Sequence, residues 1–219
     1  MSGDLSKEEI NRKLLHVLAV ALPAGIFYGP DFFEVERIWA CILGLSLTCF
    51  SIFVEVARLR NGAFGKWFLL SFGLLLRKEE KHQLTGATYL IAGGAICSLI
   101  SLQGEGAAAC AFIGLTFFIL GDAAAALTGK AFGRIKIGSK TLEGSIGCCL
   151  LCLVLGVFVF PELPGFLEGW GGELSLVQVL VLSFAVSLLE LVPFKIPGVE
   201  INDNLYVPAV TSAIAFLIR

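Results

Sequence analysis

Long runs of apolar residues alternate with short polar stretches along the whole chain. A bilayer core about 30 Å thick needs roughly 20 residues of helix to cross it, and seven of these runs approach that length. They cover residues 14–29, 38–57, 86–103, 107–128, 145–160, 176–192 and 205–218. The pattern predicts an all-α polytopic membrane protein with about seven transmembrane helices.

An eighth apolar run, at 64–76, differs from the others. It is shorter, and it carries Lys66 near its start and Arg77 and Lys78 just past its end. If it crossed the membrane, one of these basic ends would lie on the side that basic residues avoid. We therefore expect a short interfacial or re-entrant helix here and leave it out of the count of crossings.

The basic residues orient the predicted helices. With seven crossings, 14 of the 16 Lys and Arg residues fall on one side of the membrane, and only Arg37 and Arg219 fall on the other. Basic loops gather on the cytoplasmic side of membrane proteins. The N-terminus is therefore expected in the cytoplasm, beneath a bacterial inner membrane or an organelle membrane.

The composition excludes a soluble protein, and the apolar surroundings of the cysteines favour a packing role for them. The chain is 57% hydrophobic and 16% charged, with a mean hydropathy of +0.87, which leaves room for one membrane domain over 1–219 and no separate soluble domain. Its Cys149-x-x-Cys152 motif lies in an apolar run with no histidine nearby, so packing is favoured over metal or redox chemistry. No nucleic-acid partner is expected.

Four carboxylates lie within or at the ends of the apolar runs: Glu55, Asp122, Glu190 and Asp203. An ionisable group in a membrane helix is costly and marks a candidate functional site. The predicted topology places all four near the cytoplasmic surface. Glu55 and Arg58, three residues apart, fit an intrahelical ion pair as well as a site.

A basic, glycine-rich loop at 129–145 lies on the same side as these acids. It carries Lys130, Arg134, Lys136 and Lys140. Part of it is similar to a phosphate-binding P-loop with one extra serine, but the preceding strand that a P-loop requires is absent. Carboxylates that hold Mg²⁺, with Lys and Arg that neutralise phosphate, suit a nucleoside triphosphate. Taken alone, a cation such as Lys130 fits a topological role better than a site, but the interleaved glycines at 129, 133, 138 and 144 favour phosphate binding for the loop as a whole.

Seven short motifs follow one another in a characteristic order. They are Arg12-Lys13-Leu-Leu-His16, Glu55-Val-Ala-Arg58, Thr85-Gly86-Ala-Thr88-Tyr89, Gly121-Asp122 with Gly129-Lys130 and Gly133-Arg134, Lys140-Thr141-Leu-Glu143-Gly144-Ser145, Glu190, and Asp203-Asn204 with Pro208. In this order the chain resembles the CTP-dependent polyprenol kinases, a family that includes dolichol, phytol and farnesol kinases and the yeast-type CTP-dependent diacylglycerol kinase.

The resemblance implies transfer of the γ-phosphate of CTP to a lipid alcohol held in the bilayer, with Mg²⁺ as cofactor and the site at the cytoplasmic surface. It implies catalytic roles for Asp122, Glu190 and Asp203, and metal binding by Asp122, Asp203 and Asn204. The implied nucleotide-binding residues are Lys130, Gly133, Arg134, Lys136, Gly138, Lys140, Thr141, Glu143 and Gly144. Further candidates are Arg12, Lys13, His16, Glu55 and Arg58.

Two alternatives stay open at this point. A phosphatidate cytidylyltransferase would use the same nucleotide but attack its α-phosphate, and the order of the motifs favours the kinase. A small transporter would place ionisable groups near the bilayer midplane or on both sides, with broken helices in corresponding halves. His16 fits either a phosphate contact or a hydrogen bond to a neighbouring helix.

Overall fold

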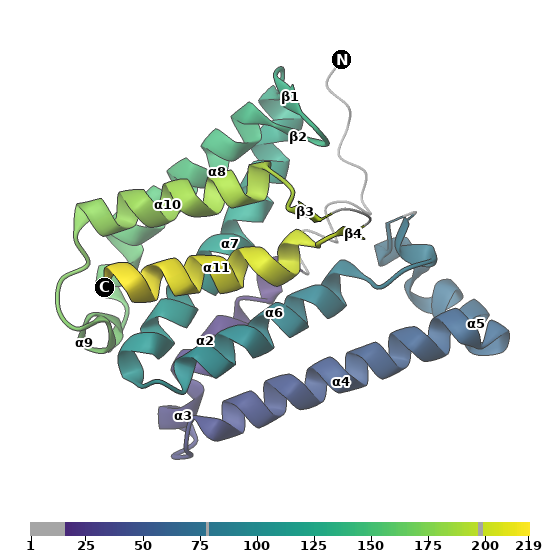
Figure 1. Ribbon diagram of the computed structural model, residues 1–219, viewed down its shortest axis with the longest axis horizontal. Coiled ribbons are helices and arrows are strands. Elements are labelled where there is room, and N and C mark those ends of the chain that lie inside the picture. Colours follow the sequence, from purple (N-terminus) through teal and green to yellow (C-terminus); the bar gives the residue numbers. More distant parts are fainter. Residues whose placement is uncertain (1–15, 78, 197–198) are drawn as a thin grey trace.

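The computed structural model describes residues 16–77, 79–196 and 199–219, and they form a bundle of helices with two small hairpins (Figure 1). The helices that follow the predicted apolar runs are α2 (Ala21–Phe27, within a helical stretch from His16), α4 (Ile38–Arg60), α5 (Gly62–Phe72), α6 (Gly86–Ser101), α7 (Glu105–Phe132), α8 (Leu142–Val154), α10 (Leu176–Leu191) and α11 (Asp203–Ile218). The predicted all-α class is thus confirmed.

Shorter elements join these helices. They are α3 (Gly29–Phe32), the 3₁₀ turns η1 (Gly73–Leu75), η2 (Glu79–Lys81) and η4 (Phe160–Glu162), the π-helical turn η3 (Leu155–Val159), and α9 (Phe166–Trp170). Two antiparallel hairpins complete the described chain: β1 (Lys136–Ile137) with β2 (Lys140–Thr141), and β3 (Lys195–Ile196) with β4 (Val199–Glu200).

Three of the described helices are long and apolar enough to cross a membrane: α4, α7, and α8 with its continuation to Glu162. The other apolar helices have 10–17 residues each. The predicted number of seven crossings therefore stays a prediction. The run at 64–76 corresponds to α5 and the turn η1. In Figure 1, α5 begins directly after α4 and turns away from it at the end of the bundle.

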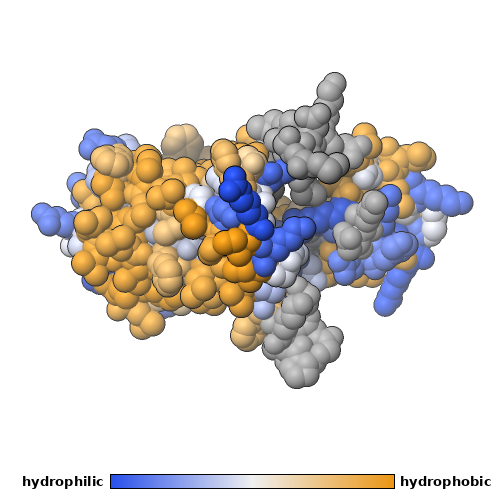
Figure 2. Space-filling model, turned by 90° about the horizontal axis from the view of Figure 1, so that it is seen from above, coloured by the Kyte–Doolittle hydropathy of each residue, from blue (hydrophilic) through white to orange (hydrophobic). Residues whose placement is uncertain are grey.

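Helix α7 forms the centre of the bundle and packs against α2, α6, α8, α10 and α11. Small residues allow these close approaches: a Cβ on Gly114 would lie 2.3 Å from the Ser212 hydroxyl of α11. Helix α4, in contrast, exposes large apolar side chains such as Phe50 and Phe53. This outer surface suits lipid, and the hydrophobic residues cover much of the face shown in Figure 2.

Several helix ends meet at one end of the bundle. Helices α6, α8 and α11 begin there, and side chains cap each start: Thr85 accepts from the Thr88 amide, Thr141 from the Gly144 amide and Asn202 from the Asn204 amide. Helix α10 ends at the same place, beside the two hairpins (Figure 1). Segments far apart in sequence therefore contribute polar groups to one surface.

Candidate functional site

Lys140 connects the first hairpin to two separate helices. Its Nζ lies 2.6 Å from Oε1 of Glu190 at the end of α10 and 2.7 Å from Oδ2 of Asp203 at the start of α11. Ion pairs this short are charge-assisted hydrogen bonds. The three residues are distant in sequence, and the fold brings them together at the end of the bundle where the helix starts are capped.

The environment of Lys140 keeps it positively charged. Burial alone would lower the pKa of its ammonium group, but the neighbouring carboxylates of Asp203 and Glu190 outweigh that effect and raise the pKa well above its usual range. A lysine that stays protonated cannot accept a proton from a substrate. Lys140 is therefore a fixed cation in this site, suited to an anionic ligand.

Asp122 adds a third carboxylate from α7. Its Oδ2 lies 3.3 Å from Nε2 of His16, which comes from the start of the first helical stretch. Asp122 and Asp203 are both near enough to Glu190 for their charges to act on it. Asp122, Glu190, Asp203 and Lys140 are called the acidic cluster below; His16 lies at its edge.

Asn204 joins the acidic cluster to α6. Its side-chain amide donates to the carbonyl oxygen of Gly86 at 2.8 Å, and its backbone amide donates to Oδ1 of Asp203 at 3.0 Å. A Cβ on Gly86 would come within 2.8 Å of the same amide nitrogen, and a Cβ on Gly93 would lie 2.6 Å from the Asn204 carbonyl. These two glycines let α6 approach α11 closely and fix the orientation of Asn204.

Glu55 and Arg58 form a buried network rather than a simple intrahelical pair. The Arg58 guanidinium donates to Glu55 at 2.9 Å through Nε and also to the carbonyl oxygens of Glu80, at 3.0 Å, and Gln83, at 2.8 Å. Glu55 also accepts from the Thr85 hydroxyl at 2.7 Å. The network anchors the segment that leads into α6, and it reaches the acidic cluster only indirectly, through the start of that helix.

The predicted nucleotide-binding loop is the β1–β2 hairpin with its flanking turns. Arg134 and Lys136 are exposed, and Gly138 has a φ of 63° in the turn. Glu143 accepts from the Ile135 amide at 3.2 Å, so its carboxylate holds the hairpin and lies away from the ion pair of Lys140. The basic side chains are thus displayed beside the acidic cluster.

The glycines that flank this hairpin have a packing role. A Cβ on Gly129 would lie 2.6 Å from the Thr141 hydroxyl, one on Gly133 would lie 2.1 Å from the Gly129 carbonyl, and one on Gly144 would lie 2.7 Å from the Ala125 carbonyl. Glycines recur in this stretch because α7 lies too close to the hairpin and to the start of α8 for larger residues to fit. Lys130 lies in the last turn of α7, on the same segment.

Oxygen ligands for a hard cation are present in the acidic cluster. In the part of the chain that the structure describes, no group of three or more His, Cys, Asp or Glu side chains is arranged to hold a metal ion unaided. Mg²⁺ in phosphoryl-transfer sites commonly binds one or two carboxylates and completes its shell with waters and substrate phosphates. The carboxylates of Asp122 and Asp203 and the amide of Asn204 fit that chemistry.

An apolar cavity of about 500 Å³ opens beside the acidic cluster. His16 and Asn204 lie on its wall, together with apolar side chains from α2, α5 and α6. Glu80 also lines it, and its carboxylate accepts from the backbone amides of Gly86, at 2.8 Å, and Arg77, at 2.7 Å. The molecule therefore places a charged cluster next to a cavity suited to hydrocarbon.

The fold brings together six of the predicted site residues: Asp122, Lys140, Glu190, Asp203 and Asn204, with His16 at their edge. Arg12 and Lys13 lie outside the described residues. Glu80 and the cavity walls were not predicted, because a glutamate in a basic loop and leucines in an apolar helix give no distinctive pattern. One signal was available: glycines recur at 25 and 29 and at 93 and 94, on the helices that border the cavity space.

Comparison with known proteins gives two relatives. The chain is 25% identical to an uncharacterized protein of Rickettsia prowazekii over 91% of this chain and 89% of that protein. It is also 25% identical to CTP-dependent diacylglycerol kinase 1 of Saccharomyces cerevisiae, over 96% of this chain and 73% of the yeast protein. No family model matches the chain, and no solved structure matches it. The chain is thus distantly similar to a CTP-dependent diacylglycerol kinase over nearly its whole length.

Proposed function

We propose that this protein is a lipid kinase that transfers the γ-phosphate of CTP to a lipid alcohol, giving a lipid monophosphate and CDP. The observation that carries the proposal is the position of Lys140, held between Glu190 and Asp203, while the next residue, Asn204, lines an apolar cavity. A permanent cation among carboxylates suits a Mg²⁺-bound triphosphate, and a neighbouring cavity suits the tail of a membrane alcohol. The distant similarity to a CTP-dependent diacylglycerol kinase supports the same reaction.

Different residues of the chain bind the phosphates and the metal ion in this proposal. Lys140, with the exposed Arg134 and Lys136, neutralises negative charge on the phosphate oxygens. Asp122, Asp203 and Asn204 would hold Mg²⁺, which when bound neutralises further charge on the triphosphate. In a single displacement, the alcohol oxygen bonds to the γ-phosphorus while the bond from that phosphorus to the β–γ bridging oxygen breaks, and CDP leaves.

The proton of the alcohol needs an acceptor, and Lys140 cannot serve. Glu190 and Asp203 are the carboxylates in direct contact with Lys140, so either can orient the hydroxyl and accept its proton as the bond to phosphorus forms. The proton then leaves from the end of the bundle, which we place on the cytoplasmic side.

The test of this proposal uses purified protein in detergent with Mg²⁺. CTP labelled at the γ-phosphate and CTP labelled at the α-phosphate are supplied in parallel to a panel of prenols, polyprenols, phytol, diacylglycerol and phosphatidic acid. Label that reaches an alcohol from the γ position only is the expected result. Label that reaches phosphatidic acid from the α position would instead identify a cytidylyltransferase and overturn the proposal.

A further inference from the structure

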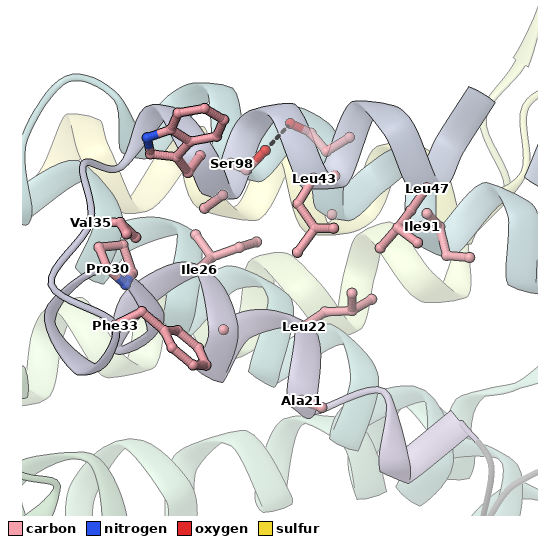
Figure 3. A pocket seen from close by; sticks show the side chains of 17 residues that line it. Ala21, Leu22, Ile26, Pro30, Phe33, Val35, Leu43, Leu47, Ile91 and Ser98 are labelled. Atoms are coloured by element: carbon pink, nitrogen blue, oxygen red, sulfur yellow. Dashed lines mark hydrogen bonds between the residues drawn. The ribbon is translucent and has the colours of Figure 1, made fainter. Parts of the chain in front are cut away.

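Two apolar cavities lie next to each other and share two lining residues. The first is the cavity beside the acidic cluster, and the second, of about 250 Å³, lies between α2, α4 and α6 (Figure 3). Leu22 of α2 and Ile91 of α6 line both cavities, so they stand at the junction. The second cavity therefore lies next to the first, on the side away from His16 and Asn204.

The walls of the second cavity follow helical periodicity. Helix α2 contributes Leu22, Gly25 and Ile26, and α6 contributes Ile91, Gly94, Ala95 and Ser98, each set at spacings of three and four that form one stripe. Gly29, at the start of α3, continues the stripe of α2. Helix α4 borders the space with Leu43, Gly44 and Leu47. In Figure 3, Ile26 and Leu43 lie on opposing helices that border this space.

The length of this path matches one bilayer leaflet. Along α6 the lining residues run from Ala87 beside the acidic cluster to Ser98 at the far end. At 1.5 Å per helical residue this stretch is about 16 Å long, roughly half of a 30 Å hydrocarbon core. A lipid tail that occupies one leaflet has a comparable length.

The second cavity offers almost no polar contact. Ser98 is one of its few lining residues with a polar side chain, and its hydroxyl already donates to the Ala95 carbonyl at 2.7 Å. A polar ligand that entered here would lose its hydrogen bonds to water without replacement. The space is suited to hydrocarbon, and the polar end of such a ligand would lie beside His16 and Asn204.

We infer that a single hydrocarbon tail of the acceptor alcohol lies across both cavities, with its hydroxyl at the acidic cluster and its end between α2 and α4. This inference rests on the proposed function. It also makes Gly25 a specificity-determining residue, because a Cβ built there meets no atom within 4 Å and the open space at this position sets the length of tail that fits.

The substitution Gly25→Leu tests this assignment. The leucine side chain fills open space in the second cavity, and leucine favours a helix more than glycine does, so the protein should fold. Transfer to alcohols with tails much shorter than about 16 Å should be retained, while kcat/KM for tails near that length should fall about tenfold or more. Gly62→Leu is the matched control, because Gly62 also has no atom within 4 Å of its Cβ position and lines neither cavity.

A second measurement separates tail binding from catalysis. A long-chain alcohol with a photoreactive diazirine at the tail end should label residues of α2 and α4 that line the second cavity, and Gly25→Leu should abolish that labelling while Gly62→Leu keeps it. Phosphate transfer with labelling elsewhere, or with no effect of Gly25→Leu on length preference, would overturn the tail assignment and leave the kinase proposal intact. Labelling of the cavity without any transfer would uphold the tail site and overturn the kinase.

Discussion

At the scale of single residues, the acidic cluster is defined by its charges. Lys140 separates Glu190 from Asp203, and Asp122 approaches from a third helix. A bound nucleotide would bring phosphate oxygens to the cation, and Mg²⁺ would take over part of the neutralisation of the acids. The cluster therefore has complementary groups for both halves of a metal–triphosphate ligand.

Replacement of one of these acids by its amide tests the cation-binding role. Asp203→Asn keeps the shape of the side chain but removes its charge, so transfer should fall by about 10²–10³-fold and the Mg²⁺ concentration for half-maximal activity should rise. The measurement is a Mg²⁺ titration of γ-phosphate transfer. Asp31→Asn, which changes an exposed residue of α3, is the control and should behave as the unaltered protein. An unchanged Mg²⁺ requirement in Asp203→Asn would remove Asp203 from the metal site.

The Glu55–Arg58 network makes a separate prediction, about stability. Both side chains are almost fully buried, and Arg58→Met would leave the Glu55 carboxylate without its cation and several carbonyls without a donor. Removing one partner of a buried ion pair costs about 3–5 kcal/mol. The unfolding temperature in detergent should therefore drop clearly. Arg60→Met, an exposed change in the same helix turn, should have little effect. Equal unfolding temperatures for the two variants would show that the network contributes little.

At the scale of elements, the hairpin that carries Lys140 depends on one turn residue. Gly138 has a φ of 63° with no atom within 4 Å of a Cβ position, so the cost of replacing it is conformational rather than steric. A β-branched residue in this region costs about 1–2 kcal/mol or more, whereas asparagine tolerates it. Gly138→Val should weaken CTP binding, measured by equilibrium binding, and Gly138→Asn should largely preserve it.

Gly165 supplies the matched control for this prediction. It has a φ of 68°, also has no atom within 4 Å of a Cβ position, and lies between η4 and α9, away from the hairpin. Gly165→Val introduces the same kind of strain and should leave CTP affinity unchanged. If both valine variants weakened binding equally, general destabilisation rather than the position of Lys140 would be responsible.

The helices were predictable from sequence because burial and lipid exposure both require apolar side chains. The runs at 38–57, 86–103 and 176–192 differ from α4, α6 and α10 by only a few residues at their ends. The hairpins were not predictable, since strands of two residues are too short to show a period of two. The site carboxylates Asp122, Glu190 and Asp203 were predictable because a charge in an apolar helix is costly. The cavities lined by Leu22 and Ile91 were not predictable because they depend on how the helices pack against one another.

At the scale of the whole molecule, the two ends of the bundle differ in charge and should face opposite sides of the membrane. The β1–β2 hairpin lies at one end of the bundle, and the segment between α9 and α10 lies toward the other (Figure 1). The hairpin carries Lys136, and the segment between α9 and α10 carries Glu173. Both side chains are exposed. From the asymmetry of basic residues we expect the hairpin on the cytoplasmic side.

Cysteine labelling checks this orientation in sealed cells. Glu173→Cys should react with a membrane-impermeant thiol reagent added outside, and Lys136→Cys should react only after the membrane is opened. The unaltered protein is the background control, because its cysteines are buried or lie within apolar helices. Reaction of Lys136→Cys from outside would invert the topology and place the acidic cluster away from cytoplasmic CTP.

The central claim is that Lys140 and its carboxylate partners transfer the γ-phosphate of CTP to a lipid alcohol. The most direct measurement compares γ-label transfer by the purified protein, by Lys140→Ala, and by Lys66→Ala, which removes an exposed cation from α5. We predict that the protein and Lys66→Ala transfer label equally, and that Lys140→Ala loses about 10²-fold or more while it remains folded. Transfer by Lys140→Ala at the rate of the unaltered protein would contradict the account.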